Sequence, residues 1–334
     1  MRMQTALSRR SFIVGAAALG AAALTGCSNS KGASAPQSGG ESAAASKMMV
    51  GTLATEDILP LWVAQQENLA ADKVDFEIVP FQSATELIAG ISSGAVNVAM
   101  TDPMVSAGVF ASGTPLELAW VTLGETAKQG RFGIMTGPNT GITSLSELAG
   151  VPVGVGSNTI LEYVMDNLME RAGIPEDQIK VEELQKLPVR FQSMMSGDVK
   201  AAALPGALLA LGEASGCVCL ADDTDGENIS QSVMAVRSDF VSAESGASAL
   251  AALQDVWDGG AALVNRDPEK YRSLLVENAN LPESVARTYP ISEYPMAKKP
   301  TGAMVDPVLA WMTKKGYLTA PLSYDQNTGK FSKE

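Results

Sequence analysis

The sequence predicts an α/β protein built as two lobes. The chain has 334 residues, more than one ordinary core holds. Its composition, 46% hydrophobic and 18% charged, can bury a substantial core. Apolar runs of strand length alternate with segments of helical spacing in steps of ~20–25 residues. Such alternation is typical of right-handed βαβ units around a mostly parallel sheet.

The first block of alternating elements begins near residue 47. Its expected strands are short apolar or alternating runs, at residues 48–53, 74–79, 96–100, 116–122 and 132–135. Its expected helices have helical apolar spacing or an early proline, and cover residues 58–68, 84–91 and 103–111. A passage rich in glycine, proline and asparagine follows at residues 137–141 and is suited to a hinge.

The second block continues the alternation. Its expected helices are residues 144–148, 159–172, 189–196 and 206–214, and its expected strands are residues 151–155, 179–184, 200–204, 217–220 and 233–236. From Asp239 onward the pattern predicts helices only, at residues 246–263, 268–279 and 305–315. Without further strands, these late helices are expected to pack on the sheet of the first lobe.

The N-terminal segment has the pattern of an export signal, expected at residues 1–26. Ser8, Arg9, Arg10 and Phe12 resemble a twin-arginine motif, with a general secretory signal as the alternative. The uncharged apolar stretch at residues 12–24, at ~1.5 Å per residue, is too short to cross a ~30 Å hydrocarbon core.

This segment ends in Leu-Thr-Gly-Cys, which resembles the lipobox of bacterial lipoproteins, so Cys27 is the expected lipidation site. The alternative is an unmodified cysteine beyond a simple signal. Residues 27–46 are rich in serine, alanine and glycine and are expected to form a flexible tether. The expected location is therefore the extracytoplasmic face of a cell membrane, reached through a lipid anchor.

Composition excludes several classes of function. The formal charge of −13 disfavours binding to nucleic acid. Histidine is absent, which removes the commonest acid–base catalyst and metal ligand. No cofactor or metal is expected. Cys217 and Cys219 are expected to be free buried thiols, because strand neighbours at i and i+2 fit a disulfide poorly.

Four motifs together resemble the nitrate/sulfonate/taurine-type ABC solute-binding proteins. Residues 146–155 (SELAGVPVGV) look like the start of that family's second lobe, and residues 194–204 (MMSGDVKAAAL) like one of its strands, with Lys200 where aspartate is frequent. Residues 95–101 (AVNVAMT) and 265–271 (NRDPEKY) match two further motifs. The similarity covers residues 48–320.

The resemblance implies a type II periplasmic-binding-protein fold, with two α/β lobes joined by a two-strand hinge and extra C-terminal helices on lobe one. Lobe one would comprise residues 47–138 and 235–334, and lobe two residues 139–234. The crossings would fall near residues 137–141 and 230–236. The implied partners are a small-molecule ligand and an ABC permease and ATPase complex, and the protein is expected to be a monomer.

Ligand contacts are expected where strands end and helices begin, because ligands of open α/β sheets bind at the carboxyl ends of strands. The expected ligand-binding residues are Thr55, Glu56, Ser83, Thr101, Asp102, Ser157, Asn158, Thr159, Arg190 and Pro205. For the hydroxyl, amide and Asp102 side chains, the alternative is a purely structural role as helix N-caps.

Glu56 and Asp57 bear on ligand identity, because two carboxylates beside a cleft repel a bare oxyanion. They favour a ligand with a cation or several N–H donors, unless both point to solvent. Trp62 and Trp120 could stack on a flat ligand or belong to the core.

The expected function is capture of a small organic or oxyanion-type solute for an ABC importer. One alternative is a ligand-presenting sensor subunit. Another is an enzyme like the thiamine-pyrimidine synthases, which rely on histidine and a cysteine-rich motif that this chain lacks.

Overall fold

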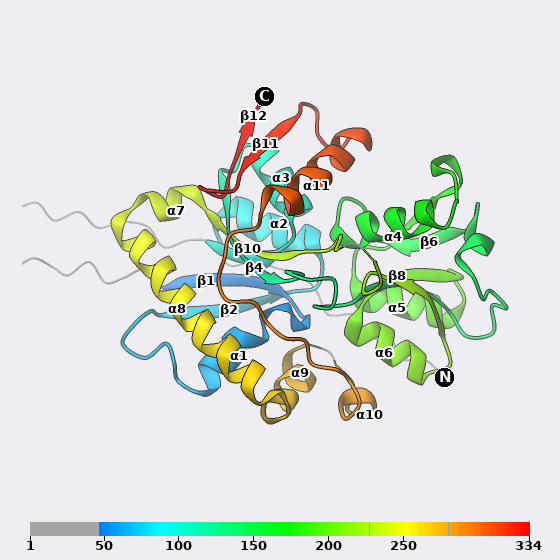
Figure 1. Ribbon diagram of the computed structural model, residues 1–334, viewed down its shortest axis with the longest axis horizontal. Coiled ribbons are helices and arrows are strands. Elements are labelled where there is room, and N and C mark those ends of the chain that lie inside the picture. Colours follow the sequence, from blue (N-terminus) through cyan, green and yellow to red (C-terminus); the bar gives the residue numbers. More distant parts are fainter. Residues whose placement is uncertain (1–46, 227, 280) are drawn as a thin grey trace, which may run out of the picture. The chain divides into compact units, whose positions relative to one another are not determined.

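The computed structural model describes residues 47–334, except Glu227 and Asn280. The predicted signal, Cys27 and the tether lie outside these residues. Within the described part the chain forms two mixed sheets, which can be followed in Figure 1. The first sheet has the order β11 (Leu322–Asp325), β12 (Lys330–Lys333), β4 (Leu116–Leu123), β10 (Ser232–Arg237), β3 (Val98–Thr101), β1 (Met48–Leu53) and β2 (Phe76–Phe81). The second has the order β7 (Lys180–Glu183), β6 (Pro152–Val155), β8 (Ala201–Pro205), β5 (Phe132–Thr136) and β9 (Val218–Asp222).

Parallel pairing in each sheet follows the predicted βαβ units. In the first sheet, β1 lies parallel to β2 and β3, and in the second, β6 lies parallel to β7 and β8. Each sheet also contains a strand that runs antiparallel to both of its neighbours. In the first sheet this is β10, between β3 and β4, and in the second it is β5, between β8 and β9. The first sheet therefore takes the chain back at β10, as the two-lobe prediction requires.

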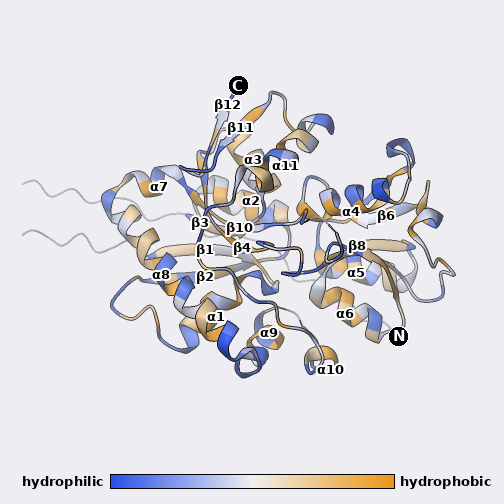
Figure 2. Ribbon diagram, viewed as in Figure 1, coloured by the Kyte–Doolittle hydropathy of each residue, from blue (hydrophilic) through white to orange (hydrophobic). Residues whose placement is uncertain are grey.

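Helices follow the strands in each sheet. Those joined to the first sheet are α1 (Leu59–Gln66), α2 (Ala84–Ser93), α3 (Pro103–Ala111), α7 (Ser238–Ser242), α8 (Glu244–Arg266), α9 (Arg272–Asn278), α10 (Glu283–Ala286) and α11 (Gly302–Lys314). Those of the second sheet are α4 (Ile160–Arg171), α5 (Leu187–Ser196) and α6 (Gly206–Ala214). Figure 2 shows α6 as a largely hydrophobic helix, and its buried residues include Ala207 and Leu209.

Two aromatic side chains that could have served as stacking platforms belong to the core. Trp120 is fully buried, and its ring lies 5.9 Å from that of Trp257 on α8. Trp62 on α1 is 6% exposed and packs in the same apolar cluster. The core interpretation of both residues is therefore correct.

The first passage of the chain between the sheets lies at a different segment from the predicted one. Because β5 pairs with β8 and β9, the first crossing lies between β4 and β5, at residues 124–131, and residues 137–141 are a loop after β5. The return lies between β9 and β10. The crossings touch at Gly124, whose φ is +87° and where a Cβ would come 2.0 Å from the carbonyl oxygen of Ser230. Only glycine fits there.

The prediction that only helices follow Asp239 is wrong. Residues 322–333 form the hairpin β11–β12, which joins the first sheet where Lys330 pairs with Glu117 of β4. Cys217 and Cys219 have free thiols, as predicted, but only Cys217 is buried, and Cys219 is half-buried. No helix in residues 47–334, the two undescribed positions aside, has the length and apolarity needed to span a membrane.

Candidate functional site

Two neighbouring cavities lie between the loops of the two sheets. The larger has a volume of about 220 Å³, and the smaller about 60 Å³. Thr55, Asp57, Phe132, Leu187 and Pro205 line both. Thr55 and Pro205 come at the carboxyl ends of β1 and β8, which is where an open α/β sheet binds its ligands. We take these cavities together as the candidate site and call them the cleft.

Most of the predicted ligand-binding residues line this cleft. The set comprises Thr55, Glu56, Ser83, Thr101, Asp102, Thr159, Arg190 and Pro205. Ser157 and Asn158 line neither cavity. Ser157 donates its hydroxyl to Glu183, and the Asn158 backbone N–H donates to Glu162 Oε2 over 2.7 Å. The contact of each of these residues with a ligand stays a prediction.

The helix-capping alternative holds for two of these side chains. Ser83 Oγ accepts from the Glu86 backbone N–H at 3.2 Å, which caps α2. Asp102 Oδ1 accepts from Val105 N–H at 2.8 Å and caps α3. Asp102 Oδ2 also accepts from Ile160 N–H of α4 at 3.3 Å. One carboxyl group thus joins the N-termini of helices from different sheets, and burial raises its pKa to about 6.

Arg190 has mainly a structural role. The residue is 2% exposed, and its guanidinium donates to the carbonyl oxygens of Leu184 at 2.8 Å, Ala203 at 3.0 Å and Gln185 at 3.3 Å. Burial lowers the pKa of Arg190 to about 10. This side chain joins the loop after β7 to strand β8, and three of its five N–H donors are already used.

Glu56 and Asp57 are buried, at 8% and 5% exposure. Both side chains therefore belong to the cleft, and the alternative that they point to solvent is wrong. The 3₁₀ turn that directly follows β1 places them there. Glu56 accepts from the Tyr289 hydroxyl, and its backbone carbonyl accepts from Tyr294 Oη at 2.7 Å. Asp57 accepts from Ser232 Oγ. Burial raises the pKa of Glu56 to about 8, and the Tyr289 hydrogen bond opposes that shift.

The raised pKa of Glu56 makes stability depend on pH. The folded carboxyl binds its proton more tightly than the unfolded one, so its contribution is complete below the ordinary pKa of 4.5 and is lost as pH rises toward 8. Between pH 5 and pH 8, we expect wild type to lose about 1 kcal/mol or more of unfolding free energy relative to Glu56→Gln. Urea unfolding of both proteins across this range measures the difference. Parallel pH profiles would contradict it.

Residues from distant parts of the chain line the cleft or bind its carboxyl groups, and they were not among the predicted ligand-binding residues. Phe132 starts β5 and forms a wall of both cavities, and Leu187 and Phe191 enter from α5. Tyr289 reaches Glu56 across 233 positions of sequence, and Ser232 reaches Asp57 across 175. Phe132 is the first residue of a predicted strand and so carried a signal, whereas nothing local marks Tyr289.

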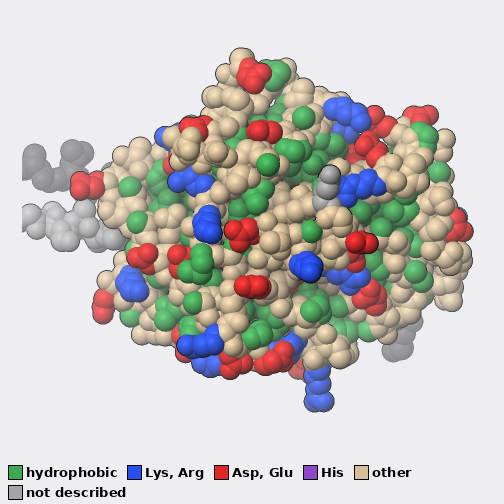
Figure 3. All heavy atoms as spheres, viewed as in Figure 1, with side chains coloured by type: hydrophobic (Ala, Val, Ile, Leu, Met, Phe, Trp, Pro, Cys, Tyr) green, Lys and Arg blue, Asp and Glu red, His purple; other side chains and the backbone are tan. Residues whose placement is uncertain are grey.

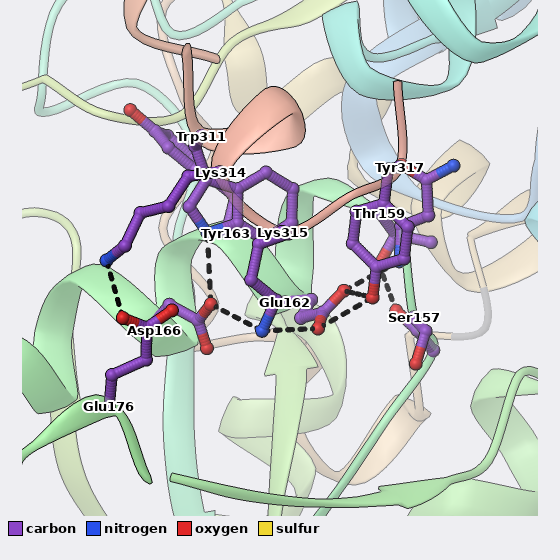
Figure 4. Close-up of polar contacts among 12 residues, drawn as sticks. Ser157, Thr159, Glu162, Tyr163, Asp166, Glu176, Trp311, Lys314, Lys315 and Tyr317 are labelled. Atoms are coloured by element: carbon purple, nitrogen blue, oxygen red, sulfur yellow. Dashed lines mark hydrogen bonds and ion pairs between the residues drawn. The ribbon is translucent and has the colours of Figure 1, made fainter. Parts of the chain in front are cut away.

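A buried ion-pair cluster beside the cleft joins α11 to α4 (Figure 4). Lys315 Nζ lies 3.1 Å from Glu162 Oε1 and 3.0 Å from Asp166 Oδ2. Trp311 Nε1 donates to Asp166 Oδ2 at 3.0 Å, and Tyr317 Oη donates to Glu162 Oε2 at 2.7 Å. Because Glu162 and Asp166 are both buried, removing Lys315 would leave two desolvated carboxyl groups without their cation.

One face of the molecule (Figure 3) lacks the basic patch that a nucleic-acid site requires. On the face drawn in Figure 3, lysine and arginine side chains lie among aspartate and glutamate side chains and form no continuous basic patch. Among the described residues, no cluster of three or more carboxyl or thiol side chains is arranged to hold a metal ion.

Comparison with known proteins identifies the family. The model of the NMT1/THI5-like family matches residues 55–270, well over half of the chain. The chain belongs to the NMT1/THI5-like family. This match and the solved structures below confirm the predicted family resemblance and the type II fold. No curated protein matches in sequence.

Several solved structures of this fold resemble the present one. The alkanesulfonate-binding protein SsuA from Xanthomonas axonopodis pv. citri has a TM-score of 0.70 at 14% identity, covering 81% of this chain and 94% of that one. A ligand-binding component of an ABC-type import system from Staphylococcus aureus has a TM-score of 0.71 at 14% identity, covering 84% and 95%. The nitrate-binding protein NrtA from Synechocystis PCC 6803 has a TM-score of 0.68 at 13% identity, covering 82% of each chain.

Proposed function

We propose that this NMT1/THI5-like protein captures a small solute in the cleft and delivers it to the permease and ATPase of an ABC importer. The observation that carries the proposal is the cavity of about 220 Å³ between loops at the carboxyl ends of strands from two sheets. Apolar walls with a few converging polar groups are typical of a small-molecule site. The fold is the one that structurally similar ABC binding components use, which supports the same role here.

The proposed mechanism is a clamp with two moving bodies. One body is the first sheet with its helices, and the other is the second sheet with its helices, joined at residues 124–131 and at the return after β9. A ligand that contacts both bodies is bound more tightly in the closed state and so shifts the population toward it. We further propose that the α4–α11 cluster stays intact and acts as the pivot, because breaking a buried ion pair costs more than parting apolar cleft walls.

Anchoring is proposed from the sequence. Cys27 at the end of a lipobox would carry a diacylglycerol, residues 27–46 would tether the folded part, and Arg9 and Arg10 would direct export. A tethered monomer at the outer face of the membrane would stay at high effective concentration near its permease.

Equilibrium dialysis against a library of small solutes, followed by mass spectrometry, tests the proposed function. We expect at least one solute to be retained at one molecule per protein, to raise the melting temperature, and to be recovered chemically unchanged. Conversion of the retained solute would indicate an enzyme instead. Retention of no solute would contradict a binding role.

A further inference from the structure

The larger cavity combines an apolar body with an acidic end. Its walls include Phe132, Leu187, Phe191, Leu208 and Leu211, and Glu56 and Asp57 lie together on one side. Such a shape suits a ligand with an apolar part and one polar group, because each part then finds a matching surface.

Asp57 lacks the partners that a buried carboxyl group normally has. It is 5% exposed and lines both cavities, and Ser232 Oγ donates to its Oδ1. Among the described residues, no second donor reaches Asp57, and no lysine or arginine forms an ion pair with it or with Glu56. A carboxylate accepts up to about four hydrogen bonds, so Asp57 with its single donor has acceptor capacity left for a ligand in the cleft.

The protein's own carboxyl groups lie at two of the helix N-termini that an oxyanion would use. At the N-terminus of α4, the Ile160 N–H is bound by Asp102. At the N-terminus of α6, Glu56 Oε1 lies against Gly206, where it would be 3.1 Å from an added Cβ. Helix N-termini are the usual backbone sites for anions, and here a carboxyl group of the protein already lies beside each of these two.

The arginines near the cleft are occupied as well. Arg190 donates to three backbone carbonyls, as described above. Arg131, which lines the larger cavity, donates from Nε to Asp222 at 2.7 Å and from Nη2 to Glu213 at 2.9 Å. A sulfonate, nitrate or phosphonate in the larger cavity would meet two carboxyl groups, and the arginine that lines this cavity, Arg131, is already paired with carboxylates.

We propose that the solute is a small organic cation, an amine or amidine, whose N–H groups pair with Asp57 while its apolar body fills the cavity beside Phe132 and Phe191. This inference rests on the proposed function and narrows its substrate class. It separates this protein from its structural neighbours, one of which binds alkanesulfonates and another nitrate according to their descriptions.

The test uses matched solutes that differ in charge. Each apolar skeleton, such as a benzyl, cyclohexyl or indolyl-ethyl group, is supplied as the amine, the alcohol and the sulfonate, together with the corresponding amidines and inorganic nitrate. Melting temperature and isothermal titration are measured at pH 7 on the mature protein. We expect the tightest binder to be a cation and its neutral and anionic counterparts to bind roughly tenfold or more weakly.

Asp57→Asn provides the residue-level test, because asparagine keeps the shape and can still accept from Ser232. We expect it to weaken the cation at least ~10-fold while its unfolding midpoint stays near that of wild type. The matched control is Asp255→Asn, an exposed residue on α8 that should leave the affinity unchanged.

The outcomes separate the two proposals. A sulfonate, nitrate or alcohol as the tightest binder would overturn the cation assignment and leave the solute-binding function standing. A cation that binds the Asp57→Asn variant as tightly as wild type would also overturn the cation assignment. Binding of no solute, whatever its charge, would remove both proposals together.

Discussion

Replacing Gly206 by alanine is expected to lower the affinity for the captured solute roughly tenfold, equivalent to about 1.4 kcal/mol. Gly206 is the first residue of helix α6, which follows β8 of the second sheet. A Cβ at this position would come 2.4 Å from Tyr289 Oη and 3.1 Å from Glu56 Oε1. Both atoms belong to the opposite side of the cleft. The added methyl group would therefore hold the two sides apart, and the closed state would lose population.

A second substitution makes this prediction specific. Tyr289→Phe removes the hydroxyl that the new methyl group would meet. Adding Gly206→Ala to Tyr289→Phe should therefore cost much less affinity than adding Gly206→Ala to wild type. Gly259→Ala on α8 serves as control, because its Cβ would meet only the flexible end of Leu69, at 3.1 Å. Equal losses from Gly206→Ala in the presence and absence of the Tyr289 hydroxyl would rule out this contact as the cause.

Replacing Cys27 by alanine is expected to move the protein almost completely from the membrane fraction to the soluble fraction. A thiol that carries a diacylglycerol contributes about 0.8 kcal/mol of membrane binding for each buried CH₂ group, and two acyl chains together give stable attachment. The helices of the described residues offer no span that could replace the anchor. Fractionation of cells that produce each variant, followed by immunoblotting, measures the shift.

The control uses a thiol of the folded part. Cys219→Ala alters a half-buried cysteine in β9 and should leave the protein with the membrane, because this thiol has no part in anchoring. If Cys27→Ala stayed in the membrane fraction after a carbonate wash, lipid attachment at this residue would be refuted.

Local sequence signals predicted the elements of the two sheets well, because each strand and helix carries its own periodicity. β1 was predicted with the observed bounds, and the start of α3 at Pro103 follows from the proline and from the Asp102 cap. The loops after β1 and β8 could be nominated as cleft walls for the same reason: the carboxyl ends of parallel strands meet at one edge of a sheet.

Long-range pairing explains what was missed. The glycine-rich passage at residues 137–141 has the composition of a turn, and composition does not distinguish a loop within one sheet from a crossing between two. Gly124 lies in a crossing between the two sheets, and this is recognisable only because Ser230 approaches it closely in space. The strands β11 and β12 are short and mixed in polarity, although the Asn-Thr-Gly turn at residues 327–329 is a hairpin signal.

The side chains that meet across the cleft could not be predicted from local sequence signals either. Tyr289 follows a short helix with no distinguishing motif, yet it sets the environment of Glu56 and limits residue 206 to glycine. The Lys315 cluster also joins residues that only the tertiary fold brings together.

Small-angle X-ray scattering of the mature protein, with and without a solute that the dialysis screen retains, tests most directly whether the two bodies close over a ligand. We expect the radius of gyration to decrease at saturation beyond experimental error. We also expect Gly206→Ala to reduce this change, because the methyl group obstructs closure. A radius of gyration that stays the same when the site is saturated would contradict the clamp.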